Sequence, residues 1–279
     1  MKAPFTAAFT SAEYAKHLLE EYSIATQFGN YINLSLLDGE ELRKREPLVG
    51  ANFHFGIELE DQALLDPPQF AKNFVSNLQQ SGVSIVENCA ISKIERNAGK
   101  LRVTKGGGQS EIFDAVVIAT GAWLNRLAGD HGVKIPVVAG IGYSMSVEVP
   151  KQTRGMLIFP ESFIACTTYQ ERLRISSFMQ MGDVETPRDP RREQRLLRNA
   201  QKILPNLHWE SVSEFWSGGR PLTPDGKPVI GKTRTQGVYV NAGHGMWGIT
   251  LGPISGKVLA ELIVGQDNER LLEKFSPLR

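Results

Sequence analysis

The chain has 279 residues with 31 basic and 30 acidic side chains, so its formal net charge is +1 and no basic surface for nucleic acid is expected. Its two cysteines, Cys89 and Cys166, give neither a disulfide framework nor a metal-ligand spacing. No apolar run reaches the about 18 residues of a membrane span, and the first residues lack the apolar core of a signal peptide.

These absences predict a soluble, cytoplasmic protein without a bound metal, and they leave peripheral membrane association open. A chain of this length buries a substantial core, either as one large domain or as two interleaved domains.

The first sixty residues predict a helix, a strand and a second, short helix. Glu13–Thr26 has the apolar spacing of an amphipathic helix, and Tyr31–Leu36 is typical of a strand. Asp38 begins a run with capping-box spacing, which predicts a short helix that Pro47 ends.

The next hundred residues begin with a clear helix start. Asp66 is suited to cap a helix whose first position is Pro67, and apolar residues follow at every fourth position as far as Leu78. Three strand-like runs follow the helix: Val83–Val86, Ala90–Glu95 and Leu101–Thr104, and Asn97-Ala98-Gly99 predicts a turn between the last two.

A continuous apolar run, Ala115–Ala119, predicts a parallel strand that is buried on both faces. It ends at Thr120-Gly121, where a ligand crevice lies at the carboxyl edge of such a sheet. The alternative is an ordinary core strand followed by a glycine turn.

The middle of the chain predicts antiparallel strands and one helix. Residues alternate between polar and apolar within Tyr143–Val149, Leu157–Thr168 and Leu173–Phe178. Pro187–Leu204 then predicts an amphipathic helix whose arginines form a solvated face.

The most informative stretch lies near the end of the chain. Arg220 follows two glycines in an expected turn, and Pro224-Asp225-Gly226 predicts a second, tight turn. The short strand Val238–Val240 leads into a glycine cluster and then a helix from about Ile249, with Pro253 expected in its first turn. A strand, a glycine turn and a helix N-terminus direct backbone N–H groups toward an electron-rich ligand.

Three runs carry a family resemblance: VVIATGAW (Val116–Trp123), FWSGGRPLTPDGKPVIG (Phe215–Gly231) and AGHGMWGIT (Ala242–Thr250). In order and separation they resemble the FAD-dependent amino-acid oxidoreductases of the D-amino-acid oxidase/glycine oxidase (DAO) type, and among these most of all the bacterial D-amino-acid dehydrogenases. The likeness extends over roughly residues 61–265. That family opens with a strand–GxGxxG–helix unit that holds the FAD pyrophosphate, and we identify no counterpart of this unit in the chain.

The resemblance implies a mixed α/β fold, in which an incomplete Rossmann-like FAD-binding domain is interleaved with an antiparallel-sheet substrate domain. Residues 1–60 are then an N-terminal helix and a substrate-domain segment. Residues 61–125 and 223–279 form the FAD-binding domain, and residues 126–222 form the substrate domain.

The resemblance also implies residue roles. Arg220 matches the family's carboxylate-binding arginine and is the expected catalytic and substrate-binding residue; alternatively it is a structural arginine paired with an acid such as Glu214. Further substrate contacts are expected from Tyr143, Phe163 and Trp247. FAD contacts are expected from Ala90, Thr120, Gly121, Trp123, Gly243, His244, Gly245, Met246, Gly248, Ile249 and Thr250.

Two of these roles have alternatives. His244 is either a general base or a residue that hydrogen-bonds to backbone, and we favour the second because flavin oxidation of a neutral amine needs no protein base. Met246 and Trp247 line the pocket or pack in the core.

The implied activity is transfer of a hydride from the α-carbon of an amino acid, D-amino acids being expected, to FAD. The imino acid then hydrolyses to a 2-oxo acid and ammonia. The implied partners are the amino-acid substrate and a separate polypeptide that carries the missing FAD-binding segment. The alternative is a flavin-free relative with a binding or structural role.

Overall fold

The computed structural model describes residues 3–29, 32–266 and 269–279. The chain divides into two compact units that alternate along the sequence. The first unit consists of Met1–Phe70, Gly142–Met179 and Pro187–Ser217, and the second of Ala71–Ile141, Gln180–Thr186 and Gly218–Arg279. Arg220 therefore belongs to the second unit.

Eight strands form one sheet in the order β12-β8-β11-β10-β9-β1-β3-β2, and most of it lies in the first unit. Its strands are β1 (Phe5–Phe9), β2 (Leu34–Asp38), β3 (Phe55–Leu59), β8 (Val138–Glu148), β9 (Met156–Phe159), β10 (Ile164–Tyr169), β11 (Arg172–Gly182) and β12 (Ser213–Leu222). The neighbours β9, β10 and β11 pair antiparallel, as the alternating sequence predicts, whereas β1 pairs with β9 in parallel. Neither β1 nor β3 was predicted from the sequence.

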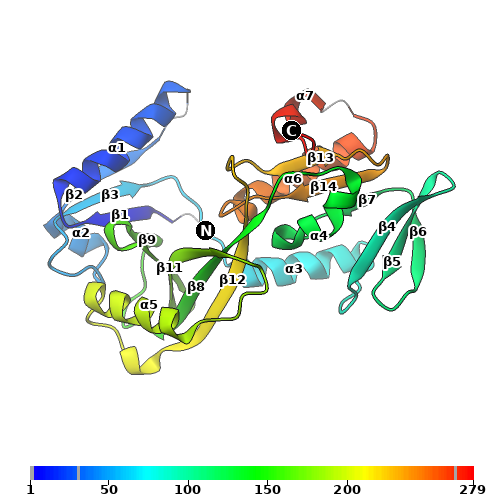
Figure 1. Ribbon diagram of the computed structural model, residues 1–279. Helices are drawn as coiled ribbons and strands as arrows, with labels where there is room; N and C mark the ends of the chain where they lie inside the picture. Colours follow the sequence, from blue (N-terminus) through cyan, green and yellow to red (C-terminus); the bar gives the residue numbers. More distant parts are fainter. Residues whose placement is uncertain (1–2, 30–31, 267–268) are drawn as a thin grey trace. The chain divides into compact units, whose positions relative to one another are not determined.

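Three helices belong to the first unit: α1 (Ala12–Gln27), α2 (Gly39–Arg45) and α5 (Pro190–Ile203). Helix α1 packs Ala15 against Ala7, Phe9 and Ile57 on one face of the sheet, and α5 lies on the opposite side (Figure 1). The Asp38 carboxylate accepts the N–H groups of Glu40 and Glu41, each at 2.9 Å, so the predicted cap of α2 is confirmed.

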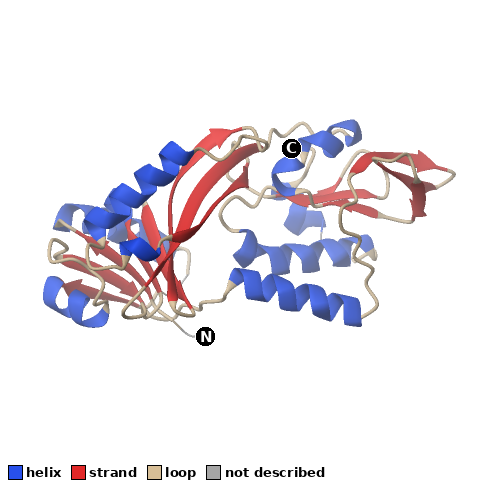
Figure 2. Cartoon of the chain, turned by 90° about the horizontal axis from the view of Figure 1, so that it is seen from below, coloured by secondary structure: helices blue, strands red, loops and turns tan. Residues whose placement is uncertain are grey.

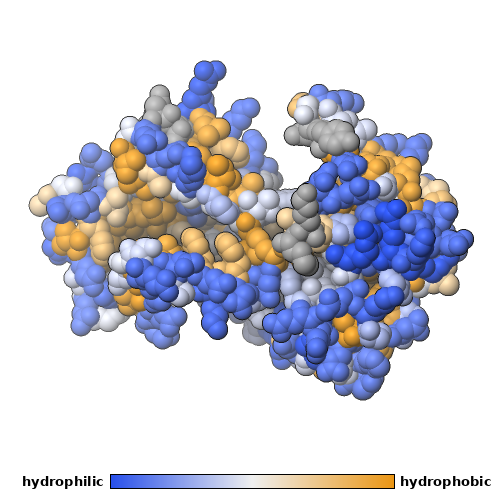
Figure 3. Space-filling view, turned by 180° about the vertical axis from the view of Figure 1, so that it is seen from behind, coloured by the Kyte–Doolittle hydropathy of each residue, from blue (hydrophilic) through white to orange (hydrophobic). Residues whose placement is uncertain are grey.

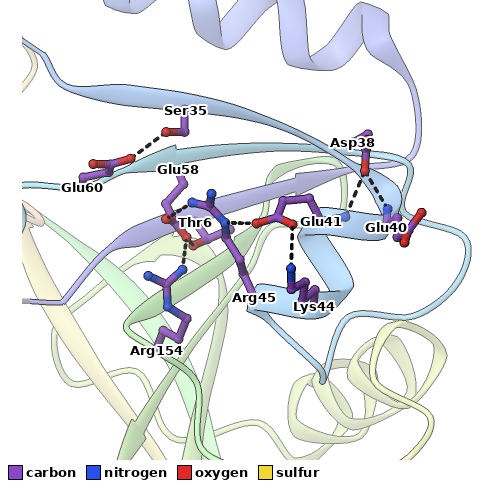
Figure 4. Close-up of polar contacts among 10 residues, drawn as sticks. All are labelled: Thr6, Ser35, Asp38, Glu40, Glu41, Lys44, Arg45, Glu58, Glu60 and Arg154. Carbon is purple, nitrogen blue, oxygen red and sulfur yellow. Dashed lines mark hydrogen bonds and ion pairs between the residues drawn. The ribbon is translucent and has the colours of Figure 1, made fainter.

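A buried carboxylate lies beside α2 (Figure 4). Glu58 is 1% exposed, and it accepts hydrogen bonds from Arg45 at 2.7 Å, Arg154 at 2.8 Å and Thr6 at 3.3 Å. The neighbouring Glu46 is fully buried but accepts only a long bond, 3.3 Å, from the Arg154 backbone N–H. Burial therefore raises the pKa of Glu46 to about 7.

The second unit contains a three-stranded sheet in the order β13 (Val229–Lys232), β14 (Val238–Ala242), β7 (Val116–Ile118). Strands β7 and β14 are parallel, with Ile118 opposite Val240. Ile118 is 2% exposed, but Val117 is 41% exposed. The prediction that this strand is buried on both faces is therefore wrong, because β7 is an edge strand that pairs only with β14.

A second, antiparallel sheet of this unit consists of β4 (Ile91–Asn97), β5 (Lys100–Lys105) and β6 (Ser110–Phe113). Figure 2 shows it as a small sheet of three strands. The first two strands are joined at Ala98 and Gly99, both of which have positive φ, as a two-residue hairpin requires. The predicted strand at Val83–Val86 is absent, and residues 83–86 form an irregular segment after α3.

The remaining helices are α3 (Pro67–Gln80), α4 (Asn125–Ala128), α6 (Gly248–Ile263) and α7 (Glu269–Leu272). Helix α3 has the predicted start, because the Asp66 carboxylate accepts the N–H of Gln69 at 3.1 Å, yet none of its residues is buried. In α6, Pro253 lies beyond the first turn, and Ile254 is 54% exposed rather than part of the buried face. Val258, Leu259 and Leu262 form that face instead.

Apolar side chains also reach the surface. The face drawn in Figure 3 carries them in several places among hydrophilic residues. Within residues 3–29, 32–266 and 269–279, no helix combines the length and the apolar character that crossing a bilayer requires.

Candidate functional site

Two glycine turns follow the parallel strands of the second unit. Thr120-Gly121 follows β7, and Gly243 follows β14. The register pairs Ile118 with Val240, so both turns leave the sheet at the same carboxyl edge. This edge is where ligands bind in open α/β sheets.

The turn after β14 contacts the end of β12, next to Arg220. Gly243 has φ +73°, and a Cβ there would lie 3.0 Å from the Thr223 Cγ2 atom, so only glycine fits without a shift. Gly245 donates its N–H to the Pro221 carbonyl at 3.0 Å. The glycine turn and the arginine are thus held together by close backbone contact.

Helix α6 begins at this turn with open N–H groups. Trp247 is its N-cap and provides no side-chain cap, and Leu251 is the first residue to donate back, to the Trp247 carbonyl at 2.8 Å. The N–H groups of Gly248, Ile249 and Thr250 therefore have no partner within the helix, and all three residues are exposed. Three free donors at a positive dipole end suit an electron-rich group.

The spacing Gly243-x-Gly245-x-x-Gly248 between a strand and a helix equals that of a dinucleotide-binding fingerprint. From the sequence these residues were expected to form only a glycine cluster, so this spacing was missed. A full dinucleotide-binding unit needs another strand after the helix, but in the described part of the chain α6 is followed by α7 and a single turn of 3₁₀ helix. The site keeps the N–H donors without the rest of that unit.

Arg220 lies in strand β12, not in the expected turn. Its Nη1 atom is buried, and among the described residues it has no hydrogen-bond partner. Burial lowers the pKa of this guanidinium. Glu214 pairs with Arg174 instead, at 3.6 Å. Glu214 is therefore not the partner of Arg220, and the alternative that paired these two residues is wrong. A buried guanidinium N–H without a partner fits an anionic ligand.

His244 binds a side chain, not the backbone as expected. Its Nε2 atom lies 3.1 Å from the Ser255 hydroxyl, which donates its own hydrogen to the Gly252 carbonyl at 3.0 Å. His244 therefore donates from Nε2. Burial lowers the pKa of the His244 ring, and its bond to Ser255 ties the glycine turn to α6.

Three further expected cofactor residues, Ala90, Trp123 and Met246, and the expected substrate residue Trp247 lie at the surface of the second unit. Met246 is 62% exposed and Trp247 is 61% exposed, which excludes core packing for both. Trp123 is also exposed and donates its indole N–H to Glu185 at 3.1 Å. Ala90 is exposed, and its carbonyl already accepts the Gly106 N–H at 2.8 Å.

Two expected substrate residues belong to the first unit. Tyr143 is 1% exposed, its ring centroid lies 5.9 Å from that of Phe178, and its hydroxyl is buried without a partner among the described residues. Phe163 is 76% exposed and has a left-handed backbone, with φ +53°.

The predicted turn at Pro224–Gly226 is confirmed, and hydrogen bonds to a distant arginine also hold it. Asp225 accepts the Lys227 N–H at 3.1 Å and two hydrogen bonds from the Arg279 guanidinium at 2.9 and 3.0 Å. The Arg279 guanidinium holds the pKa of Asp225 well below its usual range. No local pattern in the sequence identifies this partner, which lies 54 residues away.

Comparison with known proteins identifies the family of this chain. Residues 5–262 match the model of a family described as DAO, FAD dependent oxidoreductase. The chain is 29% identical over 261 residues to a D-amino acid dehydrogenase of Xylella fastidiosa (strain M12), covering 91% of this chain and 60% of the relative. It is 27% identical to a D-amino acid dehydrogenase of Neisseria gonorrhoeae (strain NCCP11945), covering 94% and 63%. The chain thus spans about three fifths of the length of these relatives.

Solved structures show the same fold. Glycine oxidase from Geobacillus kaustophilus superposes with a TM-score of 0.89 at 24% identity, over 100% of this chain and 75% of that chain. Iminodiacetate oxidase from Chelativorans sp. BNC1 superposes with a TM-score of 0.86 at 19% identity, over 99% and 76%. About a quarter of each of these larger chains has no counterpart here.

Proposed function

Because this chain belongs to the DAO family of FAD-dependent oxidoreductases, we propose that it provides most of an enzyme that oxidises the CH–NH2 group of an amino acid. D-amino acids are the proposed substrates, since relatives covering most of the chain are D-amino acid dehydrogenases. The observation that carries the proposal is the buried, unpartnered Nη1 of Arg220 beside the glycine turn.

Arg220 is proposed to bind the substrate carboxylate. A guanidinium offers a planar fork of donors that matches a carboxylate, and the Nη1 atom of Arg220 has no hydrogen-bond partner among the described residues. Binding in this way fixes the orientation of the α-carbon, which is the main contribution that a protein makes to such a reaction.

The N–H groups of Gly248, Ile249 and Thr250 are proposed to contact the flavin ring. The exposed turn and its three free donors fit an electron-rich planar group, and they would stabilise negative charge that develops on it. Bound FAD supplies the acceptor for the α-hydrogen and its electron pair. His244 is bonded through Nε2 to Ser255, so we propose a structural role for it and none as a base, and the substrate amine reacts in its neutral form.

We assign FAD binding to the second unit. Trp123, at an expected cofactor position, and Trp247, expected to contact the substrate, are exposed aromatic residues of this unit. The substrate contacts expected of Tyr143 and Phe163 stay predictions.

The open edge of β7 is proposed to accept another strand. A parallel strand normally has a neighbour on both sides, but among the described residues β7 pairs only with β14, and Val117 is 41% exposed. About a quarter of each solved chain has no counterpart here. We propose that a strand–glycine turn–helix segment, whether encoded with this chain or separately, pairs with β7 and completes the FAD site.

The test is anaerobic stopped-flow reduction of FAD by amino acids, with the chain co-expressed with the matching N-terminal quarter of a relative. D-amino acids should bleach the flavin absorbance, and the corresponding amides should do so far more slowly. Equal rates with acid and amide would remove the role of Arg220. An assembled protein that binds no flavin would favour a flavin-free binding or structural role instead.

A further inference from the structure

A cavity of about 380 Å³ lies in the first unit between the 160–163 turn and helix α5. Ser162 and Phe163 line it from the turn, and Phe178 lines it from β11. Arg195, Asn199 and Lys202 line it from α5, where their spacing of four and three residues puts them on one face of the helix.

Basic side chains outnumber acidic ones in the lining of this cavity, with Arg195 and Lys202 against Glu161. Arg195 and Lys202 form no ion pair with any residue that the structure describes, whereas Arg191 and Arg188 on the same segment pair with acids. The Arg195 guanidinium lies 5.4 Å from the centroid of the Phe178 ring.

Glu161, the acidic residue of the lining, forms no ion pair with Arg195 or Lys202 and is bonded to Thr10 instead. Both carboxylate oxygens of Glu161 are occupied by Thr10, which donates its N–H at 2.8 Å and its hydroxyl at 2.6 Å. The same two bonds anchor the 160–163 turn to the end of β1.

Phe163 is presented at some conformational cost. It has φ +53° and ψ +38°, a left-handed conformation that is unfavourable for a bulky residue. Its ring is 76% exposed, so it contributes little to the core of its unit. Such strain persists mainly where function requires it.

We propose that this cavity binds a small aromatic carboxylate. The carboxylate contacts Arg195 and Lys202, with the Asn199 amide as a further donor, and the ring packs on Phe163 and Phe178. This proposal shares one residue, Phe163, with the proposed function and rests on that function only there. The other residues that line the cavity belong to the same unit as Phe163.

The test is ligand-observed ¹⁹F NMR titration of the purified chain with 4-fluorobenzoate, without flavin. Arg195→Ala should weaken binding about 10- to 100-fold, and Arg195→Lys should recover part of it. Phe163→Gly should also weaken binding while its melting temperature stays at or above that of the wild type, because glycine accepts this φ. Arg198→Ala, an exposed arginine of the same helix that does not line the cavity, should bind as the wild type does.

Arg220→Ala separates this proposal from the proposed function, since 4-fluorobenzoate is also a carboxylate. Binding that persists in Arg220→Ala and falls in Arg195→Ala supports the cavity. Binding that is lost only in Arg220→Ala overturns it and assigns the ligand to Arg220. Absence of binding at millimolar concentration, or an equal loss in Arg198→Ala, overturns it as well.

Discussion

The arginines of this chain differ in what surrounds them. Arg45 and Arg154 share the buried carboxylate of Glu58, and Arg174 is bonded to the hydroxyls of Ser144 and Ser146. Arg220 is also partly buried, yet its Nη1 contacts no described acceptor. An unmade hydrogen bond of a buried donor costs about 1–3 kcal/mol, which a bound carboxylate would recover.

We predict that Arg220→Ala, in the assembled enzyme, lowers kcat/KM by roughly 10²- to 10⁴-fold, because up to two charge-assisted bonds of about 1.5–3 kcal/mol each are lost. Arg220→Lys should recover only part, since an ammonium does not reproduce the planar fork. Stopped-flow flavin reduction measures both variants, and the flavin spectrum itself should remain as in the wild type. Wild-type efficiency in Arg220→Ala would return this residue to a structural role.

The second prediction at this scale concerns Glu46. Its pKa is about 7 in the folded chain because of burial, and the nearest charges are those of Arg154 and Glu58. As pH rises from about 4.5 to about 7, the unfolded chain releases this proton while the folded chain retains it, so wild-type stability falls over this range. Glu46→Gln should therefore match the wild type near pH 4.5 and exceed it by on the order of 2–4 kcal/mol at pH 8.

Urea unfolding at pH 4.5, 6 and 8 measures the effect of Glu46→Gln. Glu58→Gln is the contrasting variant, because the Glu58 carboxylate is paired with two arginines. Loss of the Glu58 charge in Glu58→Gln should destabilise the protein at pH 8 by about 3–5 kcal/mol. A stability difference between Glu46→Gln and the wild type that does not change with pH would contradict the burial argument.

At the scale of elements, the site depends on one strand–turn–helix connection. Strand β14 ends at Ala242, α6 begins at Gly248, and the five residues between them are held by bonds to β12 and within α6. The donors are directed by backbone geometry, so the glycines matter more than any side chain of the turn.

Gly243→Ala should destabilise the protein by about 1–3 kcal/mol, because φ is +73° and the new Cβ would lie 3.0 Å from the Thr223 Cγ2 atom and 3.1 Å from the Val229 Cγ2 atom. Gly252→Ala is the matched control within α6, since no atom lies within 4 Å of its Cβ position. It should be neutral or stabilising by up to about 1 kcal/mol. Thermal unfolding compares the two, and equal effects would mean that the turn tolerates side chains.

At the scale of the whole molecule, the open edge of β7 and the exposed face of α3 lead us to expect that this chain associates with another segment of polypeptide. Val117, Phe74 and Val75 are each more than 40% exposed. Exposed apolar surface and an unpaired strand edge both favour association with another segment of polypeptide.

We predict that residues 1–279 alone bind FAD weakly. Among the described residues only Gly243–Gly248 has the Gly-x-Gly-x-x-Gly spacing, and we assign its helix N-terminus to the flavin ring, which leaves no such unit for the pyrophosphate. The loss of a few charge-assisted bonds, about 1.5–3 kcal/mol each, corresponds to several decades of affinity. Gel filtration in FAD-free buffer tests this, and stoichiometric FAD in the protein peak would refute it. Co-expression with a segment that pairs with β7 should restore retention.

The sequence by itself determined the local structure and the family. Asp38 and Asp66 cap the helices that they were predicted to cap, and Ala98-Gly99 forms the predicted turn. Each of these features depends on residues a few positions apart, so the local pattern contains all the interacting groups. The three motif runs likewise identified the family because their order is written along the chain.

Only the tertiary structure decided which groups meet and which stay unpartnered. Glu58 and Arg154 are 96 residues apart, and His244 meets Ser255 rather than backbone. Strands β1 and β3 pair with each other across 50 residues, and Arg220 lies in a strand where a turn was expected. Long-range pairing and burial depend on how distant segments pack, which local propensity does not encode. The burial of the Arg220 Nη1 atom without a described partner follows from the folded structure and was not predictable from the sequence.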